Sequence, residues 1–215
     1  MKNLEIPYIG VLESMPDEER LKAMELFGAK GAADNAGWPE EWPYRPSAVF
    51  SVARGDSCLF ILFHVRGLDL RAAALEDNGP VWEDSCCEFF VEHPSDGTYY
   101  NFEMNCIGTL LASKRKSRNE FTAFDHDRLK KILRYSSLER KAYDISDKIV
   151  SWEAGMGIPF SLIGMDPGCL PEKIRANFYK CGDKTAHPHF LSWAPIDTPA
   201  PDFHRPEFFG ELTIR

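Results

Sequence analysis

The sequence lacks most of the motifs that assign a chemistry by themselves. Its six cysteines show no Cys-x-x-Cys spacing of the metal-binding kind, and no serine, cysteine or threonine stands in a Gly-x-Ser-x-Gly setting. It also contains no glycine-rich loop of the phosphate-binding type. A zinc-finger site, an esterase-like nucleophile and a nucleotide site are therefore unsupported, and the cysteines are predicted to be buried and reduced.

Positive charge and long apolar runs are scarce as well. The chain has 25 Lys and Arg against 33 Asp and Glu, whereas nucleic-acid binding relies on basic patches. Its one basic run, Lys114 to Arg118, is predicted to be a solvated loop. The longest purely apolar run, Cys58 to Phe63, is far shorter than a membrane span, and the amino terminus has no signal-peptide core. We expect no nucleic-acid partner, no membrane partner and a cytoplasmic location, although export without an amino-terminal signal stays compatible with the sequence.

The composition is that of a soluble globular protein, with 44% hydrophobic and 27% charged residues. Because the chain has 215 residues, it can bury a sizeable core in one compact domain without a disulfide or a metal. The aromatic share of 13% is enough to supply both a core and an aromatic ligand surface.

The segment from Asp77 to Val91 combines a turn with an alternating strand. Asp77 to Pro80 has turn chemistry, because Asn-Gly tolerates positive φ and proline cannot continue a strand ladder. The following residues alternate, so that one face is predicted to join the core: Ser85, Cys87, Phe89 and Val91. Trp82 stands just after the turn and is predicted to be partly exposed, either as a binding platform or as a cap on the core edge.

The remaining chain predicts an all-β fold with a short N-terminal helix. A helix is expected after Pro16, with acidic residues in its first turn. Gly37 to Pro46 is expected to be a covering loop, and its Trp38 and Trp42 are interpreted as lid or core residues rather than ligand contacts. Residues 1–45 would form this helix and loop, and residues 46–215 an antiparallel, jelly-roll-like β-sandwich. Residues 114–147 show no pattern that assigns them. The expected strands are 48–53, 58–66, 84–91, 99–111, 149–158, 175–181, 189–193 and 208–214.

The strand faces opposite to the core are predicted to carry a group of polar side chains. If their strands are neighbours, the group contains Arg66, Glu88, Glu103 and Asn105. A pyranose presents apolar C–H faces and a rim of hydroxyls, so an aromatic wall such as Trp82 beside carboxylate, amide and guanidinium groups suits a saccharide.

Two other chemistries are weaker interpretations of the same residues. A glycoside hydrolase needs two carboxylic groups, and Glu88 with Glu103 would be the pair, although outward carboxylates on strands are more often solvated or salt-bridged. His187 and His189 stand two residues apart near Cys181 and Asp183, but their spacing is not that of a recognisable metal site. We therefore assign no metal ligands and no catalytic residues.

Several long motifs resemble carbohydrate-binding module family 9 and its stand-alone bacterial relatives. The signature-like segment is GPVWEDSCCEFFV at 79–91, and the resemblance, which spans roughly 46–215, continues in YYNFEMNCIGTLL at 99–111 and RANFYKCGD at 175–183. It also includes HFLSWAPI at 189–196 and PDFHRPEFFG at 201–210.

The resemblance implies a β-sandwich that holds the reducing end of a glucan or xylan fragment between two tryptophans, without catalysis, in carbohydrate catabolism. Trp82 matches the first tryptophan, Glu88 matches an acidic contact, and Trp193 matches the second tryptophan. Asn105 matches a ligand-binding asparagine, whereas Glu103 stands where sugar-binding members carry an arginine. That replacement also favours a third hypothesis, a structural or interaction domain without a ligand. The family resemblance allows structural calcium, and no other cofactor is expected.

Overall fold

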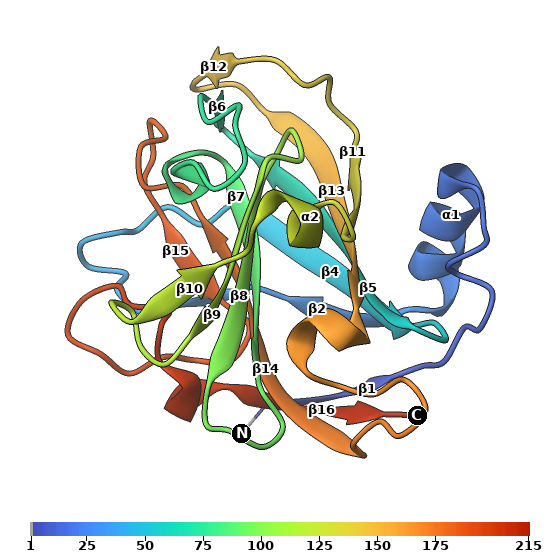
Figure 1. Ribbon diagram of the computed structural model, residues 1–215. Helices are drawn as coiled ribbons and strands as arrows, with labels where there is room; N and C mark the ends of the chain where they lie inside the picture. The colour runs from blue at the N-terminus through green and yellow to red at the C-terminus, as the bar shows by residue number, and fades with distance from the viewer. Residues whose placement is uncertain (1) are drawn as a thin grey trace.

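The computed structural model describes residues 2–215 and is built mostly from strands in two facing sheets (Figure 1). The larger sheet has nine strands and runs in the order β1-β16-β14-β7-β8-β9-β10; β15 also pairs with β14, and β3 pairs with β15. Its strands are β1 (Asn3–Ile6), β3 (Asn35–Ala36), β7 (Cys86–Glu92), β8 (Tyr99–Asn105), β9 (Leu110–Arg115), β10 (Phe121–Ala123), β14 (Lys173–Cys181), β15 (Phe190–Ser192) and β16 (Gly210–Ile214).

The smaller sheet has five strands in the order β11-β13-β5-β4-β2, and β6 pairs separately with β12. These strands are β2 (Ala29–Ala32), β4 (Ser47–Arg54), β5 (Cys58–Gly67), β6 (Leu70–Ala72), β11 (Leu133–Ser136), β12 (Tyr143–Ile145) and β13 (Val150–Pro159). Among the paired strands of residues 2–215, only β1 and β16 run parallel. The predicted antiparallel β-sandwich is confirmed, and the parallel pair arises where the first and last strands meet at one edge of the larger sheet.

Helices are short and lie outside the sandwich. The predicted N-terminal helix is α1 (Asp17–Phe27), which begins after Pro16 and places three acidic residues in its first turn, where the helix dipole favours negative charge. α1 packs on β4 and β5 through Ala23 and Met24, at the right of Figure 1 and away from β8, β9 and β10. The other helical segments are α2 (His126–Leu129) and the 3-10 turns η1 (Val81–Glu83), η2 (Phe160–Ile163) and η3 (Pro206–Phe208). Within residues 2–215 no helix combines the length and the hydropathy that a membrane crossing requires.

The main core fills the space between the two sheets. Cys87, Phe89 and Val91 point into it, as their alternation predicts, and Trp152 is buried there too. The opposite face of β7 is also covered, because Cys86 and Phe90 belong to a second cluster that contains side chains from residues 37–46 and 194–209. β7 therefore separates an inner core from a smaller outer one.

Several segments differ from the predicted boundaries. The strand expected over 99–111 is divided into β8 and β9 by a turn at Gly108, whose φ is +82°. Residues 1–45 supply three strands, β1, β2 and β3, in addition to α1. The unassigned stretch 114–147 contains the end of β9, the strands β10, β11 and β12, and α2.

We predict that Trp193→Ala lowers the free energy of unfolding by about 3–5 kcal/mol, because it leaves a cavity in the main core. The Trp193 ring is 3% exposed and packs edge-on against Phe178, with ring centroids 5.7 Å apart. Urea denaturation measures the loss, and Trp82→Ala is the matched control, because the Trp82 side chain is 38% exposed. Equal losses in the two variants would contradict the assignment of Trp193 to the core.

Candidate functional site

A cavity of about 640 Å³ opens on the outer face of the larger sheet. Its floor consists of the outward-facing side chains of β7, β8, β9 and β14, which alternate with the core residues. Five aromatic side chains line the cavity around this floor: Trp42, Trp82, Phe121, Phe190 and Phe203. The cavity therefore combines apolar walls with a polar base, as ligand pockets commonly do.

Trp82 is carried by the short turn η1 at the start of β7. Its indole lines the cavity and is 38% exposed, which confirms the predicted partial exposure. The turn is tied to the loop after β14, because the backbone N–H of Asp183 donates to the Trp82 carbonyl at 3.1 Å. An ion pair between Lys184 and Glu83, at 2.9 Å, connects the same two segments.

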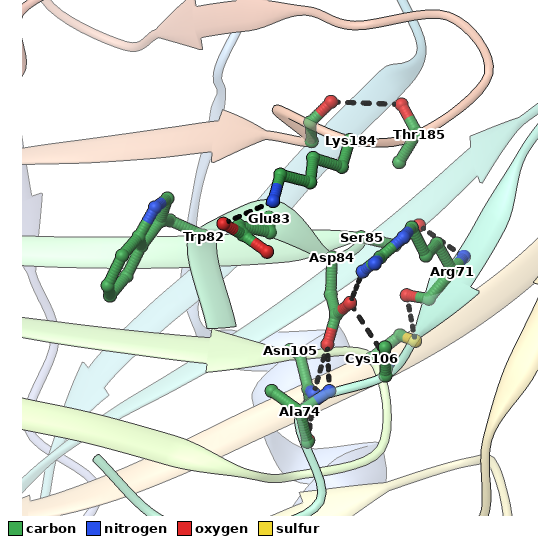
Figure 2. Close-up of polar contacts among 12 residues, drawn as sticks. Arg71, Ala74, Trp82, Glu83, Asp84, Ser85, Asn105, Cys106, Lys184 and Thr185 are labelled. Atoms are coloured by element: carbon green, nitrogen blue, oxygen red, sulfur yellow. Dashed lines mark hydrogen bonds and ion pairs between the residues drawn. The ribbon is translucent and has the colours of Figure 1, made fainter. Parts of the chain in front are cut away.

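Asp84 anchors the other side of this turn (Figure 2). Its buried carboxylate accepts hydrogen bonds from the backbone N–H groups of Ala73 and Ala74, both at 3.0 Å, and from the side-chain amide of Asn105 at 3.0 Å. It also pairs with the Arg71 guanidinium. Figure 2 shows the Trp82 indole pointing away from this cluster. The buried network therefore holds the turn while the indole stays available to the cavity.

Glu88 and Glu103 form the acidic part of the floor. They are directly opposite each other on β7 and β8, and both side chains are almost completely buried. Burial raises the pKa of Glu88 well above its ordinary value, and the nearby Cys181 and Glu103 raise it further. The Cys181 thiol donates to Glu88 Oε1 at 3.0 Å. Because the two carboxyl groups are adjacent and buried, ionisation of one disfavours ionisation of the other.

Glu103 is supported by a chain of hydrogen bonds across the sheet. The Asn101 amide donates to Glu103 Oε1 at 2.8 Å, and Arg115 Nε donates to Asn101 Oδ1 at 2.7 Å. Burial raises the pKa of Glu103 to about 7, an increase that the Asn101 hydrogen bond and the Arg115 charge limit. Asp183, at the rim, also has a pKa raised to about 6 because of burial and the neighbouring Glu83.

Two arginines of the cavity were missed by sequence reasoning. The prediction of a solvated loop over 114–118 is wrong for Arg115, which is buried on β9 and lies 4.3 Å from the centre of the Phe121 ring. Arg118 lines the cavity and pairs with Asp202 at 3.5 Å. Both belong to the stretch whose strands showed no readable alternation. Positive charge thus reaches the cavity from β9 and its following loop, although β8 carries Glu103.

A second tryptophan also lines the cavity, and it comes from the predicted covering loop. Trp42 packs edge-on against Phe190, with ring centroids 5.3 Å apart, and both line the cavity with Trp82. The interpretation of Trp42 as a lid residue agrees with this position. Its place at the cavity wall was not readable from the sequence, because a proline-rich loop has no periodicity that indicates which side faces inward.

Three of the predicted site residues lie elsewhere. Trp193 is buried between the sheets, so it does not face Trp82 across the cavity. Arg66 is exposed on β5, a strand of the smaller sheet, and so does not share a face with Glu88 and Glu103. Asn105 is on the correct face but is fully buried, and its amide is used by Asp84 and by the Ala74 carbonyl.

The possible metal ligands separate into different places. His187 contacts Asp69 at 3.0 Å, and the buried His189 contacts Lys180 at 2.8 Å, so neither joins Cys181. Among residues 2–215, two groups of three candidate ligands lie within reach of one ion, and each contains cysteine or histidine. One group is Cys86, Glu88 and Cys181, and the other is Glu25, His64 and Glu153. Calcium prefers oxygen ligands alone, and neither group provides such a set.

We predict that the contribution of Glu103 to the free energy of unfolding falls as pH rises from about 4.5 through about 7. Because the pKa of Glu103 is raised to about 7, the folded protein keeps this proton at pH values where the unfolded chain has lost it. The buried His189 and His204, whose pKa values are lowered, contribute in the opposite direction. Urea denaturation of the wild type and of Glu103→Gln at several pH values isolates the Glu103 contribution, because the wild-type value minus the variant value should fall as pH rises. Glu120→Gln, at an exposed position, serves as the control. A difference that does not change with pH would contradict the raised pKa.

Comparisons with known proteins agree with this geometry. A protein described as a candidate carbohydrate-binding protein from Bacteroides uniformis ATCC 8492 is 34% identical, with a TM-score of 0.91, and the match covers 100% of this chain and 99% of that chain. A carbohydrate-binding module family 9 from Caldicellulosiruptor kristjanssonii was solved with glucose (14% identity, TM-score 0.57, 100% and 96% covered) and with cellotriose (13% identity, TM-score 0.61, 100% and 94% covered). A search of curated protein sequences found no significant match.

The two Caldicellulosiruptor structures show that the fold is shared, although few residues are identical. The sequence profile described as carbohydrate-binding family 9 matches residues 21–214, which is nearly the whole chain. The resemblance noted in the separate motifs is therefore confirmed over their full extent. The chain belongs to carbohydrate-binding family 9.

Proposed function

We propose that the cavity binds a saccharide without catalysis and that Trp82 is its principal aromatic wall. The observation that carries this proposal is the position of a partly exposed indole above a buried polar floor that contains Glu88 and Glu103. An indole face stacks on the apolar C–H face of a pyranose, while carboxyl groups exchange hydrogen bonds with its hydroxyls. Family membership and the glucose and cellotriose bound by the structural neighbours support the same class of ligand.

The second aromatic contact is assigned to Trp42 in place of Trp193. Trp42 and Trp82 both line the cavity, whereas Trp193 is enclosed by the core. The polar contacts are assigned to Glu88 and Glu103 on the floor and to Arg118 at the rim. A protonated Glu103 donates a hydrogen bond to a hydroxyl oxygen, and its ionised form accepts one.

The ligand of this proposal is a mono- or oligosaccharide, held by the reducing end of a glucan or xylan fragment. A cavity of about 640 Å³ lies within the range of small-molecule sites, which is roughly 300–1,000 Å³. A disaccharide has about 23 heavy atoms, and at roughly 0.3 kcal/mol each the binding free energy is about 7 kcal/mol, or a dissociation constant near 10 μM. We expect weak binding of this order.

A glycoside hydrolase is the second candidate, favoured by the raised pKa values of Glu88 and Glu103. In such enzymes two carboxyl groups flank the scissile bond, one as the acid and the other as the nucleophile or base. Here the two residues are direct neighbours on adjacent strands and rise from the same floor. They approach a ligand from one side, and this arrangement favours binding over cleavage.

We predict that Trp82→Ala weakens saccharide binding at least tenfold, to the point where titration heat is lost, because the stacking surface is removed. Isothermal titration with glucose, cellobiose and xylobiose measures the change. Trp82→Phe should retain part of the affinity, and the melting temperature of Trp82→Ala should stay close to that of the wild type. Undiminished binding would contradict the proposed wall, and turnover of an aryl glycoside that disappears in Glu88→Gln would favour the hydrolase.

We also predict that a reduced, ring-opened sugar does not bind. Reduction converts the terminal pyranose into a flexible chain without a flat C–H face, and the other ring of the disaccharide is unchanged. Titrations with cellobiose and its reduced form, and with xylobiose and its reduced form, make the comparison, because the two members of each pair differ only at the reducing end. Equal affinities for the two members of a pair would show that the reducing end is not what the cavity recognises.

A further inference from the structure

Cys86, Cys181 and Glu88 form a compact buried group at the cavity floor, which Cys181 and Glu88 line. Cys86 and Cys181 are direct partners in the β7–β14 ladder, and Glu88 follows Cys86 by two residues on the same face of β7. The two sulfur atoms and a carboxylate oxygen all lie within 4.8 Å of one another, and the three side chains are buried. Cys181 and Glu88 line the cavity, so the group is reached from that side.

These distances suit a tetrahedral metal site. Zinc binds thiolate sulfur at about 2.3 Å and carboxylate oxygen at about 2.0–2.2 Å, so its ligand atoms stand roughly 3.5–3.8 Å apart. The contact between Cys181 Sγ and Glu88 Oε1, at 3.0 Å, already brings two of the atoms this close through the thiol proton. The separations between the three atoms, all within 4.8 Å, exceed these ligand-to-ligand distances by at most about 1 Å.

The charges around the group also favour a cation. The three side chains offer only sulfur and carboxylate ligand atoms, and all three are buried. Lys180 lies on the other face of β14, where its ammonium contacts His189 and the Cys181 carbonyl. A divalent cation bound between the three groups would displace the thiol protons and balance the charge.

We propose that Cys86, Cys181 and Glu88 bind a thiophilic divalent cation such as Zn²⁺ or Cd²⁺, with the fourth coordination position open to the cavity. Three protein ligands and one open position are the pattern of zinc sites that hold water or an exchangeable ligand. Calcium is disfavoured because sulfur is a poor ligand for it. Glu88 serves both the metal site and the proposed sugar site, whereas Trp82 contributes no metal ligand, so a change at Trp82 affects sugar stacking alone.

Titration of the full chain with Cd²⁺ tests the proposal, after reduction of the thiols and in a Cys169→Ser background that removes the exposed cysteine. The thiolate-to-cadmium charge-transfer absorption should rise with added Cd²⁺ and stop rising at one equivalent of Cd²⁺ per protein chain. Cys86→Ser and Cys181→Ser should each weaken Cd²⁺ binding at least about 100-fold, since even outer-shell changes cost about 10–100-fold. Cys87→Ser is the matched control, because Cys87 is equally buried but lies on the opposite face of β7 and should leave binding unchanged.

If a cysteine variant does not fold, X-ray absorption spectroscopy of the zinc-loaded Cys169→Ser protein tests the proposal instead, because it identifies the ligand atoms without changing Cys86 or Cys181. Two sulfur neighbours and oxygen neighbours are expected. The proposal would be overturned if no metal binds, or if the bound zinc has no sulfur ligands. It would also be overturned if folded Cys86→Ser and Cys181→Ser still bind Cd²⁺. Trp82→Ala separates it from the sugar proposal, since this variant should lose saccharide binding and keep Cd²⁺ binding.

Discussion

The alternation of strand β7 is the constraint on which the site depends. Successive side chains of a strand point to opposite faces, so one short segment serves two environments. Cys87 and Phe89 enter the core between the sheets, whereas Glu88 forms part of the cavity floor and Cys86 joins the outer cluster. A shift of register by one residue would place Glu88 among the apolar side chains between the sheets, without its Cys181 donor, and would place Phe89 on the polar floor.

The cavity is built from a rigid frame and an exposed aromatic side chain. Asp84 satisfies four donors from neighbouring segments and thereby holds η1, while its neighbour Trp82 remains accessible. This division explains why Asn105 is structural in this chain. Its amide completes the Asp84 network, and its carbonyl oxygen accepts the backbone N–H groups of Ile107 and Thr109 at the β8–β9 turn.

Buried polar groups give the floor its chemical character. Glu88, Glu103 and the two thiols have raised pKa values because the protein removes water from them without placing a cation beside each one. In the proposed ligand site this cost is offset when sugar hydroxyl groups or a metal ion interact with the same atoms. Arg115, on the neighbouring strand β9, limits the rise in the pKa of Glu103 through its charge, and it donates a hydrogen bond to Asn101, which in turn donates to Glu103.

Local pattern was sufficient for much of the fold. Alternation in 84–91 identified the core face of β7 and the position of Trp82 beside it, and the turn residues marked most of the strand ends. The family motifs pointed to the same sandwich. These features are local, because side-chain alternation and turn chemistry depend on neighbouring residues only.

Only the tertiary structure decided which residues distant in the sequence lie next to each other. Trp42, Arg115 and Arg118 joined the cavity from a proline-rich loop and a charged stretch, while Trp193 entered the core and Arg66 went to the other sheet. Alternation tells which residues share a face of one strand, but it does not tell which strands are neighbours or which loop folds over a sheet. Those choices depend on contacts between residues far apart in the chain.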